Sequence, residues 1–157
     1  MQNARTLFLV AICMLSLLAG CNAKKESKEA KEYMGSVAAY TVEVNDYSKD
    51  ATEIVASDKN LNQKSSTLLN KTTKMRKEIK IFNAIEPPRT LRHVHRKIVA
   101  QNYLLDDSLY VLESSIKAGK VTSSALSAGM QKVKPNETTQ KIAKLIKLFK
   151  NEQKKKS

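Results

Sequence analysis

The chain has 157 residues, among them two cysteines, four glycines, three prolines and no tryptophan, and its formal net charge is +13. This length predicts one compact domain rather than several. The scarcity of glycine and proline, beside abundant alanine, lysine, leucine, serine and glutamate, favours an all-α fold over a sheet.

The first element is an apolar run from Leu7 to Gly20, which follows a single basic residue, Arg5. Its fourteen residues make about 21 Å of helix, whereas a membrane span needs roughly 20 residues. The run is therefore too short for a span, and its length predicts a signal peptide over residues 1–20. The run ends in Leu18-Ala19-Gly20-Cys21, which resembles the lipobox of bacterial lipoproteins, where the cysteine becomes residue one and carries a diacylglycerol thioether. The alternative is a general secretory signal that happens to contain a cysteine.

A lipobox implies that Cys21 anchors the protein to the extracytoplasmic face of the cell membrane. Because Cys13 would leave with the signal peptide, the mature chain would then keep no free thiol, which excludes disulfides, zinc ribbons and cysteine nucleophiles. This location also excludes nucleic acid as the partner of the basic charge. Residues 22–32 contain no large apolar side chain, so we expect residues 21–32 to form the lipid anchor and a tether.

The segment 33–82 carries an apolar stripe in which steps of four and three residues alternate. Its fifteen positions, twelve of them apolar, are Tyr33, Val37, Tyr40, Val44, Tyr47, Ala51, Ile54, Asp58, Leu61, Ser65, Leu68, Thr72, Met75, Ile79 and Phe82. No proline interrupts the stretch. The pattern therefore predicts one helix of about fifty residues, on the order of 75 Å long.

The dipeptide Pro87-Pro88 breaks this pattern, because proline disfavours helical geometry in the residue before it. A second stripe with the same spacing follows, at Leu91, His95, Ile98, Asn102, Leu105, Leu109, Leu112 and Ile116. Gly119 suits the left-handed position just past a helix end. The two stripes predict a long helical hairpin folded about the prolines.

Folding that hairpin symmetrically pairs Phe82 with Leu91 and Met75 with Ile98, and it places Thr72 opposite Asn102. We expect Thr72, Asn102 and His95 to form a structural polar layer in which Thr72 and Asn102 share a buried hydrogen bond. The alternative is an open bundle in which both groups contact water. His93, two residues from His95, is expected to face solvent.

The segment 82–105, FNAIEPPRTLRHVHRKIVAQNYLL, resembles a segment of uncharacterised small helical lipoproteins of Bacillus-type Gram-positive bacteria. The shared positions are Phe82, Glu86, Pro87, Pro88, Leu91, His95, Ile98 and Asn102. The resemblance covers about a quarter of the mature chain beside the lipobox. It implies a helical lipoprotein of the cell surface and brings no activity, ligand or catalytic residue with it.

Shorter helices are expected in the last third of the chain. Thr122 can cap one that runs to about Val133, and Asn136 or Thr138 can cap a last one with an apolar stripe at Ile142, Leu145, Ile146 and Phe149. These helices would cover the part of the first helix that the second leaves unpaired. The prediction is therefore a three- or four-helix bundle over residues 33–150, followed by a basic tail, 151–157.

Positive charge is concentrated from Met130 to Ser157, where nine lysines face two glutamates. The hypothesis is that this segment binds the anionic surroundings of an anchored lipoprotein, namely anionic lipid, teichoic acid or an acidic protein. The lysines proposed for this role are Lys141, Lys144, Lys147, Lys150, Lys154, Lys155 and Lys156. The alternative is a tail that serves solubility alone.

We find no catalytic residue, metal site or cofactor motif in the sequence. His93 and His95 point about 200° apart on a helix and cannot share a metal, while Asp106, Asp107 and Glu113 fit a solvated helix face. The favoured hypothesis is a non-enzymatic surface lipoprotein that binds a partner. The alternative is a small-ligand-binding bundle, open near Tyr33, Tyr40 and Tyr47, and an enzyme ranks third. An apolar cavity would favour the ligand, whereas a continuous core with an exposed apolar stripe would favour the partner.

Overall fold

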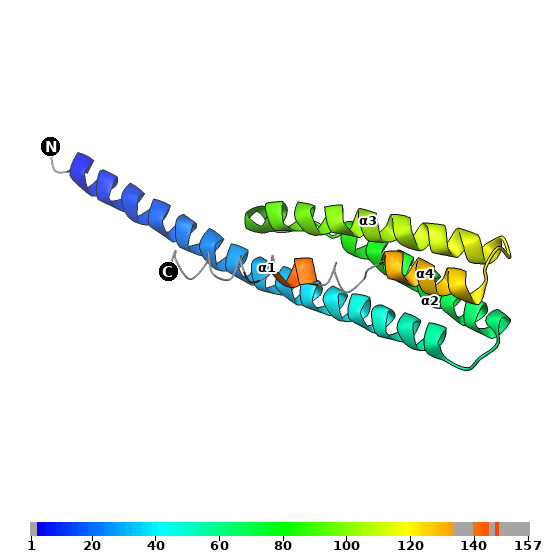
Figure 1. The fold of residues 1–157 in the computed structure, drawn as a ribbon. Coiled ribbons are helices and arrows are strands. Elements are labelled where there is room, and N and C mark those ends of the chain that lie inside the picture. The colour runs from blue at the N-terminus through cyan, green and yellow to red at the C-terminus, as the bar shows by residue number, and fades with distance from the viewer. Residues whose placement is uncertain (1–2, 134–139, 145–146, 148–157) are drawn as a thin grey trace.

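In a computed structural model, the backbone is described for residues 3–133, 140–144 and 147, and the side chains for residues 28–130, 140–144 and 147. These residues form α1 (Asn3–Ala56), α2 (Leu61–Asn83), the short 3-10 helix η1 (Arg89–Leu91), α3 (Arg92–Lys117) and α4 (Ser123–Val133). Residues 140–144 are also helical, and the described chain contains no strand. The prediction of an all-α bundle is confirmed. Figure 1 shows that the N-terminal part of α1 extends well beyond the other helices.

The predicted single helix over 33–82 is wrong, because the chain turns between Ala56 and Leu61. The Ser57 hydroxyl donates to the carbonyl of Ile54, and the Asn60 side chain accepts a hydrogen bond from the backbone N–H of Gln63 (3.0 Å). These short polar side chains satisfy backbone groups that a continuous helix would satisfy itself. Helices α1 and α2 therefore form a hairpin of their own.

The second turn lies at Pro87-Pro88, as predicted, but the register of α2 against α3 differs from the prediction. Arg76, next to Met75, contacts Asp106, eight residues beyond the predicted partner Ile98. Residues 85–88 are not helical, so the chain runs past the end of α2 before η1 and α3 begin. As a result, α3 reaches back along α1, beyond the end of α2 (Figure 1).

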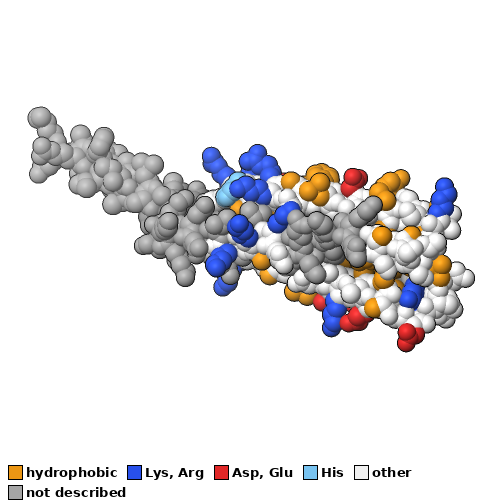
Figure 2. Space-filling model, in the orientation of Figure 1, with side chains coloured by type: hydrophobic (Ala, Val, Ile, Leu, Met, Phe, Trp, Pro, Cys, Tyr) orange, Lys and Arg blue, Asp and Glu red, His pale blue; other side chains and the backbone are white. Residues whose placement is uncertain are grey.

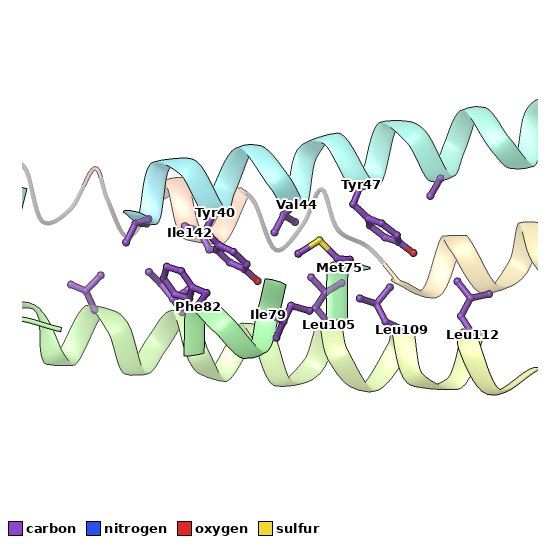
Figure 3. Packing of buried hydrophobic residues seen from close by; sticks show 14 of the residues in the cluster. Tyr40, Val44, Tyr47, Met75, Ile79, Phe82, Leu105, Leu109, Leu112 and Ile142 are labelled. Atoms are coloured by element: carbon purple, nitrogen blue, oxygen red, sulfur yellow. The ribbon is translucent and has the colours of Figure 1, made fainter. Parts of the chain in front are cut away.

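The core lies between α1, α2 and α3, and α4 closes part of it (Figure 3). The predicted stripes supply most of its side chains. Those that are fully buried include Val37, Val44, Leu68, Leu91, Ile98, Leu109, Leu126 and Ile142. Hydrogen-bonded pairs between α1 and α3 share one sequence separation of 62 residues, so these two helices run parallel, with α2 antiparallel to both.

The C-terminal elements follow the prediction where they are described. Gly119 has φ of 64° just after α3, and the Thr122 hydroxyl accepts from the backbone N–H of Ala125 (3.2 Å) at the start of α4. Figure 3 shows Ile142 beside Tyr40 of α1. Leu145, Ile146 and Phe149, predicted on the same apolar stripe, lie outside the described residues.

Candidate functional site

Cys21, the predicted lipidation site, lies on α1, the helix that enters the bundle. Its side chain is outside the described residues. The predicted tether, 21–32, is helical, so Cys21 stands about 18 Å of helical rise before Tyr33, the first fully packed side chain. The segment is a spacer of fixed length rather than a loose chain.

Two tyrosines of α1 hold polar side chains of α3 inside the bundle. The hydroxyl of Tyr33 lies 2.9 Å from Nδ1 of His95, and the hydroxyl of Tyr40 donates to Oδ1 of Asn102 at 2.7 Å. Asn102 then donates through Nδ2 to Oδ1 of Asn83 at 2.7 Å, which links α3 to α2. His95 and Asn102 are thus bonded, buried groups of one interface.

Thr72 is bonded separately, and its predicted pairing with Asn102 is wrong. The hydroxyls of Tyr47 and Thr72 lie 3.1 Å apart, while both hydrogen bonds of Asn102 go elsewhere. The alternative of an open, wet layer is also wrong, because Thr72 and Asn102 are both fully buried. The physical reason is the inserted hairpin turn at 57–60, which lays the tyrosines of α1 over both residues.

Burial shifts the pKa values of the three tyrosines and of His95. It raises the pKa of Tyr33 and Tyr40 well above the ordinary value, and it raises the pKa of Tyr47 to about 12. Burial also lowers the pKa of His95, against the opposing effect of its hydrogen bond to the backbone of Asn83. Neutral His95 therefore accepts from Tyr33 with one ring nitrogen and donates to the Asn83 carbonyl with the other.

The tyrosine rings at this end pack against another aromatic ring of the core. Tyr40 stacks on Phe82 with ring centroids 4.3 Å apart, and Tyr33 lies 6.5 Å from the same ring. Among the described residues, every buried side-chain nitrogen and oxygen has a hydrogen-bond partner. Tyr33, Tyr40 and Tyr47 are buried parts of the core, and Tyr47 also lines a hollow of about 220 Å³ between α1 and α2, beside Asp50 and Lys71.

A charged cluster on α2 and α3 replaces the solvated acidic face that the sequence predicts. Arg76 donates to Asp106 (2.8 Å) and to Glu113 (2.6 Å), and Glu113 also accepts from Lys117. Glu113 is buried, and the hydrogen bonds from Lys117 and Arg76 hold its pKa below the ordinary value. Asp107 alone among the three predicted acidic residues is exposed. The prediction fails because it treats α3 without the arginine that α2 brings to it.

The outer face of α3 carries an apolar patch, named here the outer stripe and defined by Tyr103, Leu104, Tyr110 and Val111. Each of these side chains is more than half exposed. The guanidinium carbon of Arg76 lies 5.1 Å from the centre of the Tyr110 ring, so the charged cluster holds this exposed ring in place. The sequence does carry a signal for this patch. The apolar pair at 103 and 104 is repeated seven residues later at 110 and 111, at positions outside the predicted buried stripe.

A groove of about 430 Å³ runs beside the outer stripe, between α3 and α4. Its lining includes Asp107, Val111, Leu112, Val121, Ala125 and Gly129. The groove and the outer stripe share Val111 and therefore form one continuous surface. This surface is the candidate functional site, and its location differs from the tyrosine end that the sequence suggests for a ligand.

The described lysines of the predicted anionic-surface site are Lys141, Lys144 and Lys147, and all three are exposed. Lys150, Lys154, Lys155 and Lys156 lie outside the described residues. His93 is exposed, as expected. In the described part of the chain, no three His, Cys, Asp or Glu side chains come together to hold a metal ion. No helix found there is long and apolar enough for a membrane span.

One family model matches the chain over residues 28–151, which include the whole described bundle, and its description is "Family of unknown function (DUF6376)". No curated protein and no solved structure matches the chain. The family match covers 124 of the 157 residues. The chain therefore belongs to the family DUF6376.

Proposed function

We propose that this chain is a membrane-anchored, non-enzymatic lipoprotein of the cell surface whose bundle binds an apolar helix of a protein partner. The observation that carries the proposal is the outer stripe. Its large apolar side chains are exposed on a helix whose opposite face already completes a packed core. Clustered exposed apolar residues on a soluble bundle are typical of interaction sites.

The spacing of the outer stripe supports a helical partner. Tyr103 and Tyr110 are seven residues apart, as are Leu104 and Val111, and this repeat matches the contact spacing of paired helices. The contact between Arg76 and Tyr110 fixes one aromatic ring before any partner arrives. Rigid, exposed tyrosines lose little conformational entropy on binding and are frequent energetic anchors of interfaces.

The groove between α3 and α4 favours a second candidate, a small apolar ligand. Its volume, about 430 Å³, lies in the range of small-molecule sites. A solvent-sensitive apolar dye tests this candidate: its emission should rise with the protein and fall back in Ala125→Leu, which fills the groove. Dye binding that survives Ala125→Leu would leave the partner as the sole candidate.

The lipid anchor is tested by Cys21→Ala in cells supplied with labelled palmitate. Only the Cys21 thiol can form the thioether, so we expect the label to disappear from the protein and the protein to leave the membrane fraction. Cys13→Ala, which lies inside the predicted signal peptide, is the matched control and should keep the label. Label that persists in Cys21→Ala would contradict the anchor.

The partner site is tested by a photo-cross-linking residue at Leu104 in cells, with the same residue at the exposed Lys49 of α1 as control. We expect a discrete adduct from position 104, lost when Tyr110→Ser and Val111→Ser are added, and no such adduct from position 49. Peptides in the adduct should carry an apolar seven-residue repeat. An adduct with a second copy of the chain, or equal products from both positions, would refute the proposed partner.

A further inference from the structure

The two ends of the bundle differ in charge. At the end where α1 enters, the segments 28–33 and 80–97 hold seven basic and three acidic side chains, a net charge of +4. At the opposite end, the segments 49–71 and 107–120 hold six basic and five acidic side chains, a net charge of +1. Figure 2 shows Lys and Arg gathered where α1 enters the bundle, and acidic groups toward the far end.

We name the basic group at the entry of α1 the basic collar. It consists of exposed side chains from α1, α2, η1 and α3: Lys28, Lys31, Lys80, Arg89, Arg92, Arg96 and Lys97. The fold brings these segments to one level, because the rings of Tyr33, Phe82 and His95 contact one another there, with centroids 5.7 to 6.5 Å apart. The shifted register of α3 adds to the collar by carrying Arg89 and Arg92 past the end of α2.

The collar also lies close to the predicted anchor. Lys28 follows Cys21 by seven residues of continuous helix, about 10 Å of rise. This distance is comparable with the screening length of about 8 Å at physiological ionic strength, so Lys28 feels the potential of the surface that holds Cys21. Arg96 and Lys97, next to His95 at the level of Tyr33, stand about 18 Å along the helix from Cys21 and reach that surface only if the bundle leans toward it. Lys144 adds exposed positive charge on the helical residues 140–144, whose Ile142 is buried in the same core as Tyr40, and Lys147 is exposed as well.

We propose that the basic collar binds anionic phospholipid headgroups of the membrane that holds Cys21, and so fixes the bundle end-on to that membrane. This inference rests on the proposed lipoprotein function. A membrane is favoured over another acidic partner because α1, α2, η1 and α3 all contribute to the collar, and because α1 itself leads to the predicted anchor. The phosphates of such headgroups match these cations in charge.

The ion pairs Lys28–Glu32 and Arg92–Glu86 within the collar are weak competitors for the lipid. Lys28 lies 3.8 Å from Glu32, and Arg92 lies 3.5 Å from Glu86, with all four side chains more than half exposed. Exposed pairs of this kind contribute little in water. Phosphates can therefore replace the two glutamates as partners.

The test uses the full chain, purified from membranes in its anchored form and reconstituted in phosphatidylcholine vesicles with or without phosphatidylglycerol. A fluorophore on His93→Cys reports the distance from the collar to headgroup-quenching lipids, and one on Asp58→Cys reports the far turn. We expect strong quenching at 93 with phosphatidylglycerol at low salt, and loss of that quenching at high salt. The label at 58 should stay unquenched in every case.

The variant Arg89→Gln, Arg96→Gln, Lys97→Gln should reduce the phosphatidylglycerol-dependent quenching at least several-fold, because each cation near the surface strengthens binding by about fivefold. The matched control is Lys49→Gln, Lys59→Gln, Lys120→Gln, which removes the same charge from exposed positions at the other end and should change nothing. Urea unfolding of both triple variants serves as the control for folding, and we expect both to unfold at the wild-type midpoint.

Quenching that is equal in both lipids, or that falls equally in both triple variants, would overturn the collar. Displacement of the label from phosphatidylglycerol vesicles by equimolar soluble teichoic acid would assign the collar to that polymer and also overturn the proposal. The intact mass of the purified chain shows whether Cys21 carries a lipid, and this measurement does not depend on the quenching experiment. A mass without lipid refutes the anchor, and the collar is then scored by co-sedimentation of the same variants with the two kinds of vesicle.

Discussion

The two faces of α3 carry the same seven-residue repeat and end in opposite environments. On the inner face, Ile98 and Leu105, seven residues apart, are buried against α1 and α2. On the outer face, Leu104 and Val111 have the same spacing and are more than half exposed. The spacing of apolar residues therefore indicates that α3 has two faces that can pack against another helix. Only the tertiary structure shows which of the two faces the chain itself covers.

On the inner face of α3, the polar side chains are hydrogen-bonded and the apolar side chains are packed. Asn102 and His95 lie within it, and tyrosines of α1 bond both. The outer face has the opposite character, since Arg76 lies over the Tyr110 ring and still leaves that side chain more than half exposed. The difference suggests that inner positions determine stability, whereas outer positions are available for binding.

The adjacent leucines 105 and 104 test this difference most directly. Leu105→Ala should cost about 2 to 5 kcal/mol in the free energy of unfolding, because it leaves a cavity in a packed core. Leu104→Ala should change it by less than about 0.5 kcal/mol, as is usual for an exposed side chain. Urea unfolding followed by circular dichroism measures both values. Equal losses would mean that the outer stripe is covered in the folded chain.

Asn102→Leu tests whether the inner face depends on its polar contacts. It removes the partner of the buried Tyr40 hydroxyl, and we expect a loss of about 1 to 3 kcal/mol. Adding Tyr40→Phe removes the stranded hydroxyl, so the double variant should be more stable than Asn102→Leu alone. A double variant less stable than that single variant would show that the hydroxyl keeps another partner.

The smallest effect should come from pH, through His95. Its pKa is lowered in the folded state, so folding favours the neutral ring. The contribution of His95 is therefore complete above its ordinary pKa of about 6.5 and is lost as the pH falls below that value toward the folded-state pKa. Protonation also removes the acceptor for the Tyr33 hydroxyl.

We expect the urea midpoint of the wild-type protein to decline from about pH 6.5 downward, and this decline to vanish in His95→Gln. His93→Gln, two residues away and exposed, is the control and should keep the wild-type slope. Glu113 acts in a separate range, since its pKa lies below the ordinary value of 4.5 and its contribution is lost below that pH. A slope unaffected by His95→Gln would exclude the histidine as its cause.

The sequence predicts the buried stripes well, because burial in a helical bundle follows the spacing of apolar residues. Tyr33, Val44 and Ala51 in α1, Leu91 in η1 and Leu109 in α3 are all buried as predicted. The turn at the prolines and the left-handed Gly119 are also predicted correctly, since both rest on backbone sterics. These features depend on neighbouring residues and need no knowledge of the partner helix.

The errors concern how helices meet. The apolar spacing continues through Asp58 into Leu61 and hides the turn, although Asn60 followed by Gln63 resembles a helix cap. The non-helical residues 85–88 shift α3 along α2, and this shift displaces the predicted pairing of Thr72 with Asn102. The cluster of Arg76, Asp106 and Glu113 could not be found for the same reason: it requires the register of α2 against α3.

The separation of 62 residues between the bonded partners of α1 and α3 has a consequence for the order of folding. The contact between Tyr47 and Thr72 spans 25 residues, so the α1–α2 hairpin closes a shorter loop and loses less chain entropy. The hydroxyls of Tyr33 and Tyr40 can bond only after α3 has been synthesised, and these contacts join residues far apart in the sequence. In the helix nearest the predicted anchor, Tyr33 and Tyr40 thus gain their hydrogen-bond partners only after α3 has emerged, although both rings can contact Phe82 of α2 before then.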